Sequence, residues 1–366
     1  MRFRPELRTS YRQDIALFNT GSKQLAVAVL LLVALLAPML LTDDILQLLA
    51  AACIAAIGAI GLNLVTGYAG QVSLGHAFFI AVGAYTAAAI SGDPEGRTIG
   101  FGQEEILIWL PAAGLVAALT GVIVAPLATR LRGLYLAIVT LGLVFVGGHV
   151  FNEWTELTGG PGIGREAAVP VLFGYPLNQD GPFLTKDQQL YLLMLVLLVV
   201  FALAARNLAR SKVGRAFNAI RDRDIAAGVM GVNLIKYKTI AFAVSSGYAG
   251  CAGALLYTIS GYFTPNSFDL LLSVQYIAMV LIGGAGTISG SIMGAFFITM
   301  LPRLTQELPA ILPFLSGVPS DTPNVFQLQQ ILYGVLIVVF LIFEPRGLYG
   351  VWLRIRNYWK AWPFSY

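Results

Sequence analysis

The chain has 366 residues, of which 57% are hydrophobic and only 11% are charged, whereas a soluble domain carries roughly 25% charged residues. Together with a mean hydropathy of +0.76, this composition excludes nucleic-acid-binding, disordered and disulfide-rich secreted proteins and predicts an integral membrane protein. The net charge is +4, but in such a protein the placement of the charges matters more than their sum.

Nine stretches contain no Asp, Glu, Lys or Arg and are close to the roughly 20 residues that a helix needs to cross a bilayer. They cover 25–41, 45–65, 72–90, 106–128, 133–151, 190–205, 239–263, 270–301 and 326–343. The last but one has 32 residues, too many for one crossing, and carries a cluster of glycines in its middle. We therefore expect two short helices there. The prediction is an all-α polytopic bundle of about ten transmembrane segments with glycine-broken short helices.

The charged residues divide unequally between the loops of this ten-segment arrangement. With the N-terminus inside, the inner loops hold 19 of the 23 basic residues, and the outer loops hold 14 of the 19 acidic residues. This is the positive-inside asymmetry of membrane proteins. It predicts a cytoplasmic N-terminal segment 1–24, a membrane domain 25–343 and a cytoplasmic C-terminal tail 344–366. The acidic outer loop 152–189 is either solvated or a contact surface for an external protein.

One uncharged connection, TGYAGQVSLGH (66–76), combines glycines with several polar side chains. Irregular backbone is not tolerated in lipid, so such a stretch is covered by protein or lines a wet cavity. A plain tight turn is the alternative. We expect it to line a solute pathway, with the following residues: Asn63, Gly67, Gly70, Gln71, Ser73 and His76. The glycines of two other sets are expected to pack helices: Gly247, Gly250 and Gly253, and Gly286, Gly290 and Gly294.

The inner loop 206–238 carries eight basic residues against only Asp222 and Asp224. Ser211 can cap a helix that bears an apolar stripe, and a second, shorter helix is expected to end at Gly231. The loop is thus predicted to form two short helices at the membrane surface. From the residues alone, it can bind anionic lipid head groups or dock a cytoplasmic partner.

Several segments resemble those of one transporter family. The run RAFNAIRDRDIAAGVMGVNLIKYKTIAFAVSSGYAGCAGALL (215–256) resembles the coupling-loop region of branched-chain amino-acid ABC importer permeases. Further similar segments are GLNLVTGYAGQVSLGHAFFIAVGAYTAA (61–88), GLYLAIVTLG (133–142), LTGGPGI (157–163) and SFDLLLSVQYIAMVLIGGAGTISGSIMGA (267–295). They span most of the chain from about residue 45 to 348 in family order. Within the family, the chain is similar to the M-type permease, the longer of the paired membrane subunits.

The resemblance implies a coupling site for ATPase subunits in the 206–238 loop. ABC permeases carry there an acidic residue, two alanines, three variable residues and a glycine. The acidic position is occupied by Ile225, with an aspartate one place earlier. The coupling residues implied in this way are Arg215, Asp224, Ala226, Ala227 and Gly231.

The resemblance also implies the partners and the location. The chain would be a bacterial inner-membrane subunit, itself not an enzyme, that forms half of a translocation pathway. It would assemble with a homologous second permease, two ABC ATPases and an extracytoplasmic solute-binding protein, in contact with membrane lipid and not with nucleic acid. ATP and Mg would be bound by the ATPases, since the chain has no Gly-x-x-x-x-Gly-Lys-Ser/Thr phosphate loop. No cofactor or metal site is expected in this chain.

Three alternatives to a branched-chain amino-acid importer remain at this stage. Urea and short amides are carried by closely similar ABC permeases, so the solute stays open. A sodium-coupled secondary transporter can work with uncharged ligands alone, although the coupling-loop resemblance argues against it. A membrane-embedded enzyme would need a carboxylate or metal-ligand cluster, which none of the apolar stretches carries.

Overall fold

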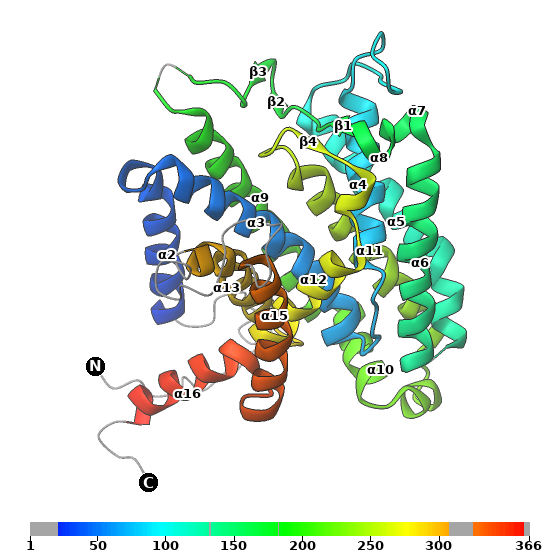
Figure 1. The fold of residues 1–366 in the computed structure, drawn as a ribbon. Coiled ribbons are helices and arrows are strands. Elements are labelled where there is room, and N and C mark those ends of the chain that lie inside the picture. The colour runs from blue at the N-terminus through cyan, green and yellow to red at the C-terminus, as the bar shows by residue number, and fades with distance from the viewer. Residues whose placement is uncertain (1–20, 132, 182, 307–324, 362–366) are drawn as a thin grey trace.

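The fold is described by a computed structural model that covers residues 21–131, 133–181, 183–306 and 325–361 (Figure 1). Of the predicted N-terminal segment 1–24, residues 1–20 lie outside the described residues. Residues 362–366 of the predicted C-terminal tail lie outside them as well. Helices dominate the described ranges. The all-α class expected from the sequence is therefore confirmed.

Most of the long helices follow the apolar stretches and extend past several of their ends. The long helices are α2 (Gly21–Leu40), α3 (Asp43–Asn63), α4 (His76–Ser91), α5 (Ile106–Arg130), α6 (Leu134–Glu153), α9 (Lys186–Arg210), α10 (Lys212–Val229), α11 (Leu234–Leu256), α12 (Leu270–Gly283), α13 (Ile288–Gln306), α15 (Val325–Phe343) and α16 (Gly347–Ala361). Of these, α10 and α16 lie in the basic loop 206–238 and in the tail 344–366.

Short elements connect them. They are η1 (Leu64–Tyr68), α7 (Thr155–Thr158), α8 (Gly160–Ile163), β1 (Arg165–Glu166), β2 (Val171–Leu172), β3 (Tyr175–Pro176), β4 (Tyr262–Phe263) and η2 (Pro265–Ser267). The strands form two antiparallel pairs, β1 with β4 and β2 with β3.

Seven of the described helices are long and apolar enough to cross a membrane, and three shorter apolar helices cover Gln24–Leu40, His76–Ser91 and Gln327–Phe340. The chain is thus a polytopic helical membrane protein. The number of ten crossings stays a prediction, because the shorter helices do not by their length establish a crossing.

The long apolar stretch 270–301 is broken as the sequence predicts. Helix α12 ends at Gly283 and α13 begins at Ile288, and between them Gly284 and Gly286 have φ of +121° and +78°, a backbone region that favours glycine. Gly286 therefore lies in the hinge and not on a helix-packing ridge, contrary to expectation. Gly294 does pack helices, since a β-carbon there would overlap the Met279 carbonyl on α12.

Among the seven helices of membrane-spanning length, α3 and α11 are the most buried. The span that begins with α3 is 72% buried, whereas α9 is only 22% buried. Helix α11 lies against α3, α4 and α5 (Figure 1). Its contact with α4 is made by backbone, because a β-carbon on Gly83 would overlap Gly250 and one on Gly253 would overlap the Ile80 carbonyl. The expected packing role of Gly250 and Gly253 is confirmed. Small residues allow this close approach, on which helix association in lipid depends.

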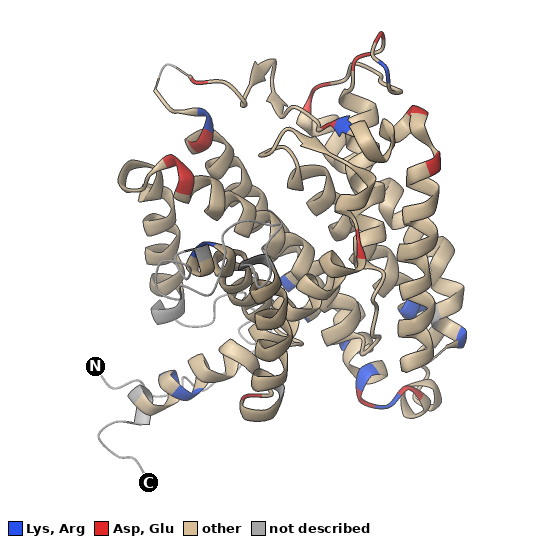
Figure 2. Ribbon diagram, in the orientation of Figure 1, with Lys and Arg blue, Asp and Glu red and all other residues tan. Residues whose placement is uncertain are grey.

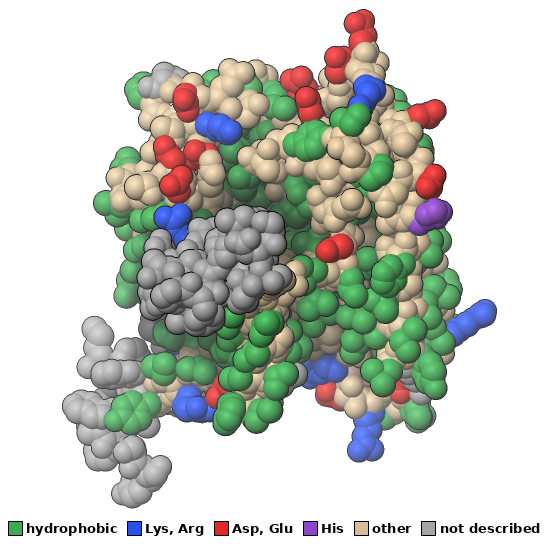
Figure 3. Space-filling view, in the orientation of Figure 1, with side chains coloured by type: hydrophobic (Ala, Val, Ile, Leu, Met, Phe, Trp, Pro, Cys, Tyr) green, Lys and Arg blue, Asp and Glu red, His purple; other side chains and the backbone are tan. Residues whose placement is uncertain are grey.

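Charged side chains gather at the two ends of the bundle. Figure 2 shows most Asp and Glu at the end that carries the short strands, α7 and α8, and many Lys and Arg at the opposite end, around α10 and α16. Between them, the described part of the visible face carries few charges, and hydrophobic side chains are dense over its lower half (Figure 3). This arrangement suits a protein whose middle lies in lipid and whose ends lie in water.

The acidic end contains one buried cation, Arg165, which is only 3% exposed. Its guanidinium donates to the carbonyl oxygens of Ala88, Ile99 and Leu157, each at 2.6 Å. Burial lowers its pKa to about 10, so it remains protonated at neutral pH. A solvated loop was one expectation for the segment 152–189. The hydrogen bond from Arg165 to the Ala88 carbonyl instead fixes this segment to the end of α4.

We predict that Gly83→Ala destabilises the protein by about 1–3 kcal/mol, since the added methyl group has to displace the backbone of α11. Gly148→Ala is the matched control, because it adds the same group to a helix where nothing lies within 4 Å. Thermal unfolding of the two purified variants should show a lower Tm for Gly83→Ala only. Equal Tm values would contradict backbone contact between α4 and α11.

Candidate translocation pathway and coupling site

The chain breaks where α3 ends. The π-helical turn η1 prolongs α3, and Gly70 then takes a φ of +68°. The backbone stays non-helical until α4 begins at His76. Single π-turns often mark functional sites. Most side chains of this break are buried, so the irregular backbone is covered by protein, as expected for a break between membrane helices.

Three polar side chains of the break hold buried atoms without a hydrogen-bond partner among the described residues. These atoms are Thr66 Oγ1, both amide atoms of Gln71, and His76 Nε2. An unpaired buried polar group costs about 1–3 kcal/mol. The break thus holds four buried polar atoms that are left without a hydrogen bond by the described residues.

Asn63, by contrast, is fully used within the protein. Its amide nitrogen donates to the Thr287 carbonyl at 2.9 Å and to Ser291 Oγ at 2.7 Å. Its amide oxygen accepts from the Gly286 nitrogen at 2.8 Å. The side chain that was expected to serve the solute pathway thus fixes the hinge between α12 and α13 to the end of α3. Ser291 contributes to the same lock.

The other predicted pathway residues lie along the break. Ser73 is buried and its Oγ accepts from the Gly75 nitrogen at 3.4 Å. The His76 ring hydrogen-bonds to the backbone of Gly58 and lies 4.9 Å from the Tyr276 ring, measured between centroids. Gly67 and Gly70 provide room for neighbouring backbone, as described below.

Two hydroxyl groups that the sequence analysis did not single out hold the break in place. Thr140 Oγ1 accepts from the Leu74 nitrogen at 2.9 Å, and Ser273 Oγ accepts from the Ala77 nitrogen at 3.0 Å. Both residues are completely buried. Each is a single hydroxyl in an apolar run, and such a hydroxyl commonly bonds within its own helix. Nothing local in the sequence distinguishes these two.

The predicted pair of short helices is present within α10, which is interrupted at Arg223 by extended backbone (φ −158°, ψ 104°). Ser211 caps the first helix, with its Oγ accepting from the Val213 nitrogen at 3.1 Å. The connection covers only 211–233, shorter than the predicted 206–238. Helix α9 continues to Arg210, because a basic residue in its last turn stabilises the C-terminal end of the helix and can lie in water.

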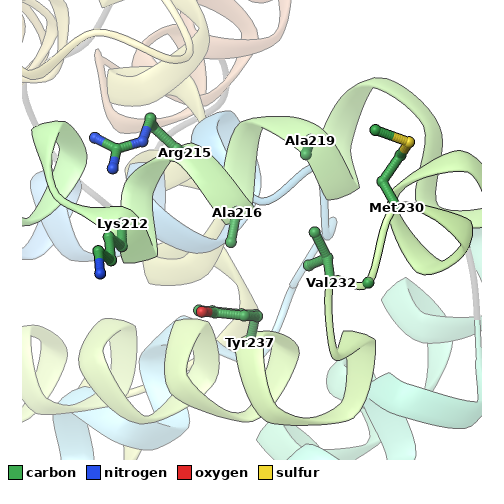
Figure 4. Close-up of a pocket in the computed structure, with 8 residues that line it drawn as sticks. Lys212, Arg215, Ala216, Ala219, Met230, Val232 and Tyr237 are labelled. Atoms are coloured by element: carbon green, nitrogen blue, oxygen red, sulfur yellow. The ribbon is translucent and has the colours of Figure 1, made fainter.

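The five predicted coupling residues do not share one face. Arg215 and Gly231 line a groove of about 350 Å³ between α10 and the start of α11 (Figure 4), and Asp224 lines a second cavity. Ala226 is exposed, whereas Ala227 is buried.

The apolar side chains that the helix pair presents to its surroundings are Ile225, Val229 and Met230. They are 70%, 83% and 83% exposed, respectively. The surface that they form is called the apolar tip below.

The second cavity, of about 220 Å³, brings the two predicted sites together. Gly70 and Gln71 line it from the break, and Arg221 and Asp222 line it from α10. The buried Lys238 at the start of α11 lines it as well. The pathway segment 66–76 and the coupling loop 206–238 are far apart in the sequence. In the structure they are neighbours.

Comparison with known proteins gives these sites a context. Residues 44–341 match a family described as the permease component of branched-chain amino acid transport systems. The high-affinity branched-chain amino acid transport system permease proteins LivM of Salmonella typhimurium and Escherichia coli are each 30% identical over an alignment of 348 residues that covers 90% of this chain and 76% of theirs. The autoinducer 2 import system permease protein LsrC of Enterobacter sp. is 30% identical over an alignment of 220 residues that covers 56% of this chain and 57% of that protein. No solved structure matches the chain.

The family match covers the helices from α3 to most of α15, with the break after α3, the helix pair α10 and the hinge between α12 and α13. The similarity to LivM extends over still more of the chain. The chain therefore belongs to the family of branched-chain amino acid transport system permease components and is a permease of the LivM type.

Proposed function

We propose that the chain is the membrane-spanning subunit of an ATP-driven importer and forms half of a pathway for branched-chain amino acids. The observation that carries this proposal is the similarity to LivM over 90% of the chain. The similarity to LsrC covers only 56%, so a solute of that system is less well supported. Urea and short amides stay as the second group of candidate solutes.

The buried polar atoms of the break suit such a solute. A zwitterionic amino acid needs hydrogen-bond partners inside the membrane, where an unpaired polar group costs several kcal/mol. Neutral groups such as those of Thr66, Gln71 and His76 supply these partners without a fixed charge that would hold the solute too firmly. The energy would come from two ATPases at the apolar tip, and a binding protein would deliver the solute at the acidic end.

An uptake assay with competitors tests the proposed solute. The chain is expressed together with a second permease, ATPases and a solute-binding protein of the same organism, and the entry of radiolabelled leucine is measured. Unlabelled isoleucine and valine should compete, whereas urea and acetamide should not. Competition by urea alone would move the assignment to the second group, and uptake that persists without ATPases would exclude an ABC importer.

We predict that the basic end faces the cytoplasm. Lys212→Cys at the start of α10 should then resist a thiol reagent that cannot cross the membrane, while Glu95→Cys at the acidic end should react in intact cells. The native Cys53 and Cys251 are buried and give little background. Labelling of Lys212→Cys in intact cells would reverse the proposed topology.

We predict that Met230→Glu separates the permease from its ATPases, because a carboxylate on the apolar tip would be desolvated in the interface. The amount of ATPase that co-purifies should fall about tenfold or more, the usual scale for a mispaired interface charge. The control Met230→Leu keeps an apolar side chain and should bind normally. Normal co-purification of Met230→Glu, with normal uptake, would favour lipid contact at this surface.

We predict that Gln71→Leu cuts uptake by about tenfold or more while the Tm stays equal or rises, since an unpaired buried amide is replaced by an apolar group of similar size. Ser291→Ala should do the reverse. It removes a partner of the Asn63 amide, which costs about 1–3 kcal/mol, so the Tm falls and uptake follows the amount of folded protein. Full uptake by Gln71→Leu would remove this side chain from the pathway.

A further inference from the structure

One side chain joins the helix pair to the broken helix. The Arg221 Nη1 donates to the Gly67 carbonyl oxygen at 3.1 Å, while Nε and Nη2 each donate to Asp222 Oδ1 at 3.2 Å. Gly67 lies in the last turn of the α3–η1 helix, where carbonyl groups lack partners within the helix and attract a cation. Arg221, which belongs to α10, thus donates a hydrogen bond to a carbonyl group at the end of a membrane helix.

The segments around this hydrogen bond pack closely, with glycines at the points of contact. A β-carbon on Gly70 would lie 3.0 Å from Arg221 Cα, and one on Gly286 would lie 3.1 Å from Arg221 Nη1. A β-carbon on Gly67 would overlap the Gly286 nitrogen. Helix α10, the break after η1 and the hinge between α12 and α13 therefore touch one another almost directly. Close-packed groups of this kind transmit a displacement and do not absorb it.

Arg221 lies between a buried part and an exposed part of the helix pair α10. Toward the interior, Phe217 and Ile220 are buried and hold the first helix of α10 in the protein. Toward the outside, the chain changes direction at Arg223 and leads to the apolar tip. A force applied at the tip therefore reaches the buried part of α10 next to Arg221.

We propose that Arg221 is the positioning residue that transmits a movement of α10 to the solute pathway. The proposal rests on the importer function proposed above, in which ATPases press on the apolar tip. Arg221 does not contact the solute. When α10 moves, its guanidinium shifts the Gly67 carbonyl, and with it the adjoining Thr66 and Gln71, whose polar atoms are closed off in this structure.

The test compares Arg221→Gln with the wild type in the complete complex, in proteoliposomes. Two rates are measured: ATP hydrolysis with and without solute-loaded binding protein, and solute uptake. We expect the stimulation of hydrolysis by loaded binding protein, and uptake per ATP, to fall about tenfold or more, the factor for one charge-assisted hydrogen bond. Basal hydrolysis and co-purification of the ATPases should not change. A purely structural role would instead lower the amount of complex.

Two further variants sharpen the comparison. Arg223→Gln removes the same charge two residues away and should keep wild-type coupling. Arg221→Lys keeps a cation that can reach the Gly67 carbonyl and should recover part of the coupling. If Arg221→Gln fails to assemble, Arg221→Lys carries the test, because it should then assemble and show a reduced uptake per ATP.

The proposal fails if Arg221→Gln is coupled like the wild type, or if Arg223→Gln loses as much, since the loop's charge would then be responsible. If the wild-type complex itself shows neither solute-stimulated hydrolysis nor uptake, the proposed importer function fails, independently of Arg221.

Discussion

A backbone that leaves helical geometry inside a membrane has to find its hydrogen bonds in the protein, and the sites described here follow from that requirement. The chain breaks its helices after α3 and between α12 and α13. The freed groups are then taken up by Asn63, Thr140 and Ser273, and by a guanidinium from α10. At the acidic end, Arg165 does the same for three carbonyls.

These bonds unite parts that are remote in the sequence. The end of α3 and the hinge are more than 200 residues apart, yet Asn63 binds them together. The break after η1 and the helix pair are joined through Gly67. Among the buried polar atoms without a hydrogen-bond partner in the described residues, four belong to Thr66, Gln71 and His76 in the break itself. They lie in the segment that we propose as the solute pathway.

Much of this arrangement could be predicted from the sequence, because it depends on the average composition of single segments or on local capping residues. The apolar stretches, the glycine hinge within 270–301 and the Ser211 cap all follow from hydropathy, glycine content and local capping preferences. The role of Asn63 could not be predicted, since it depends on Gly286, which is distant in the sequence. Arg221 looked like one basic residue among eight in its loop. Only the fold shows which of them reaches a helix end.

The backbone contact between α4 and α11 also has a consequence for biosynthesis. Helix α4 has 16 residues, too few to span a bilayer comfortably on its own, and its partner Gly250 emerges from the ribosome only after roughly 160 further residues, about 8–32 s of translation. During that interval, the surface around Gly83 has no native partner. The contact between α4 and α11 therefore forms late, and slow translation of the chain between them would lengthen the time during which Gly83 lies against lipid or another helix.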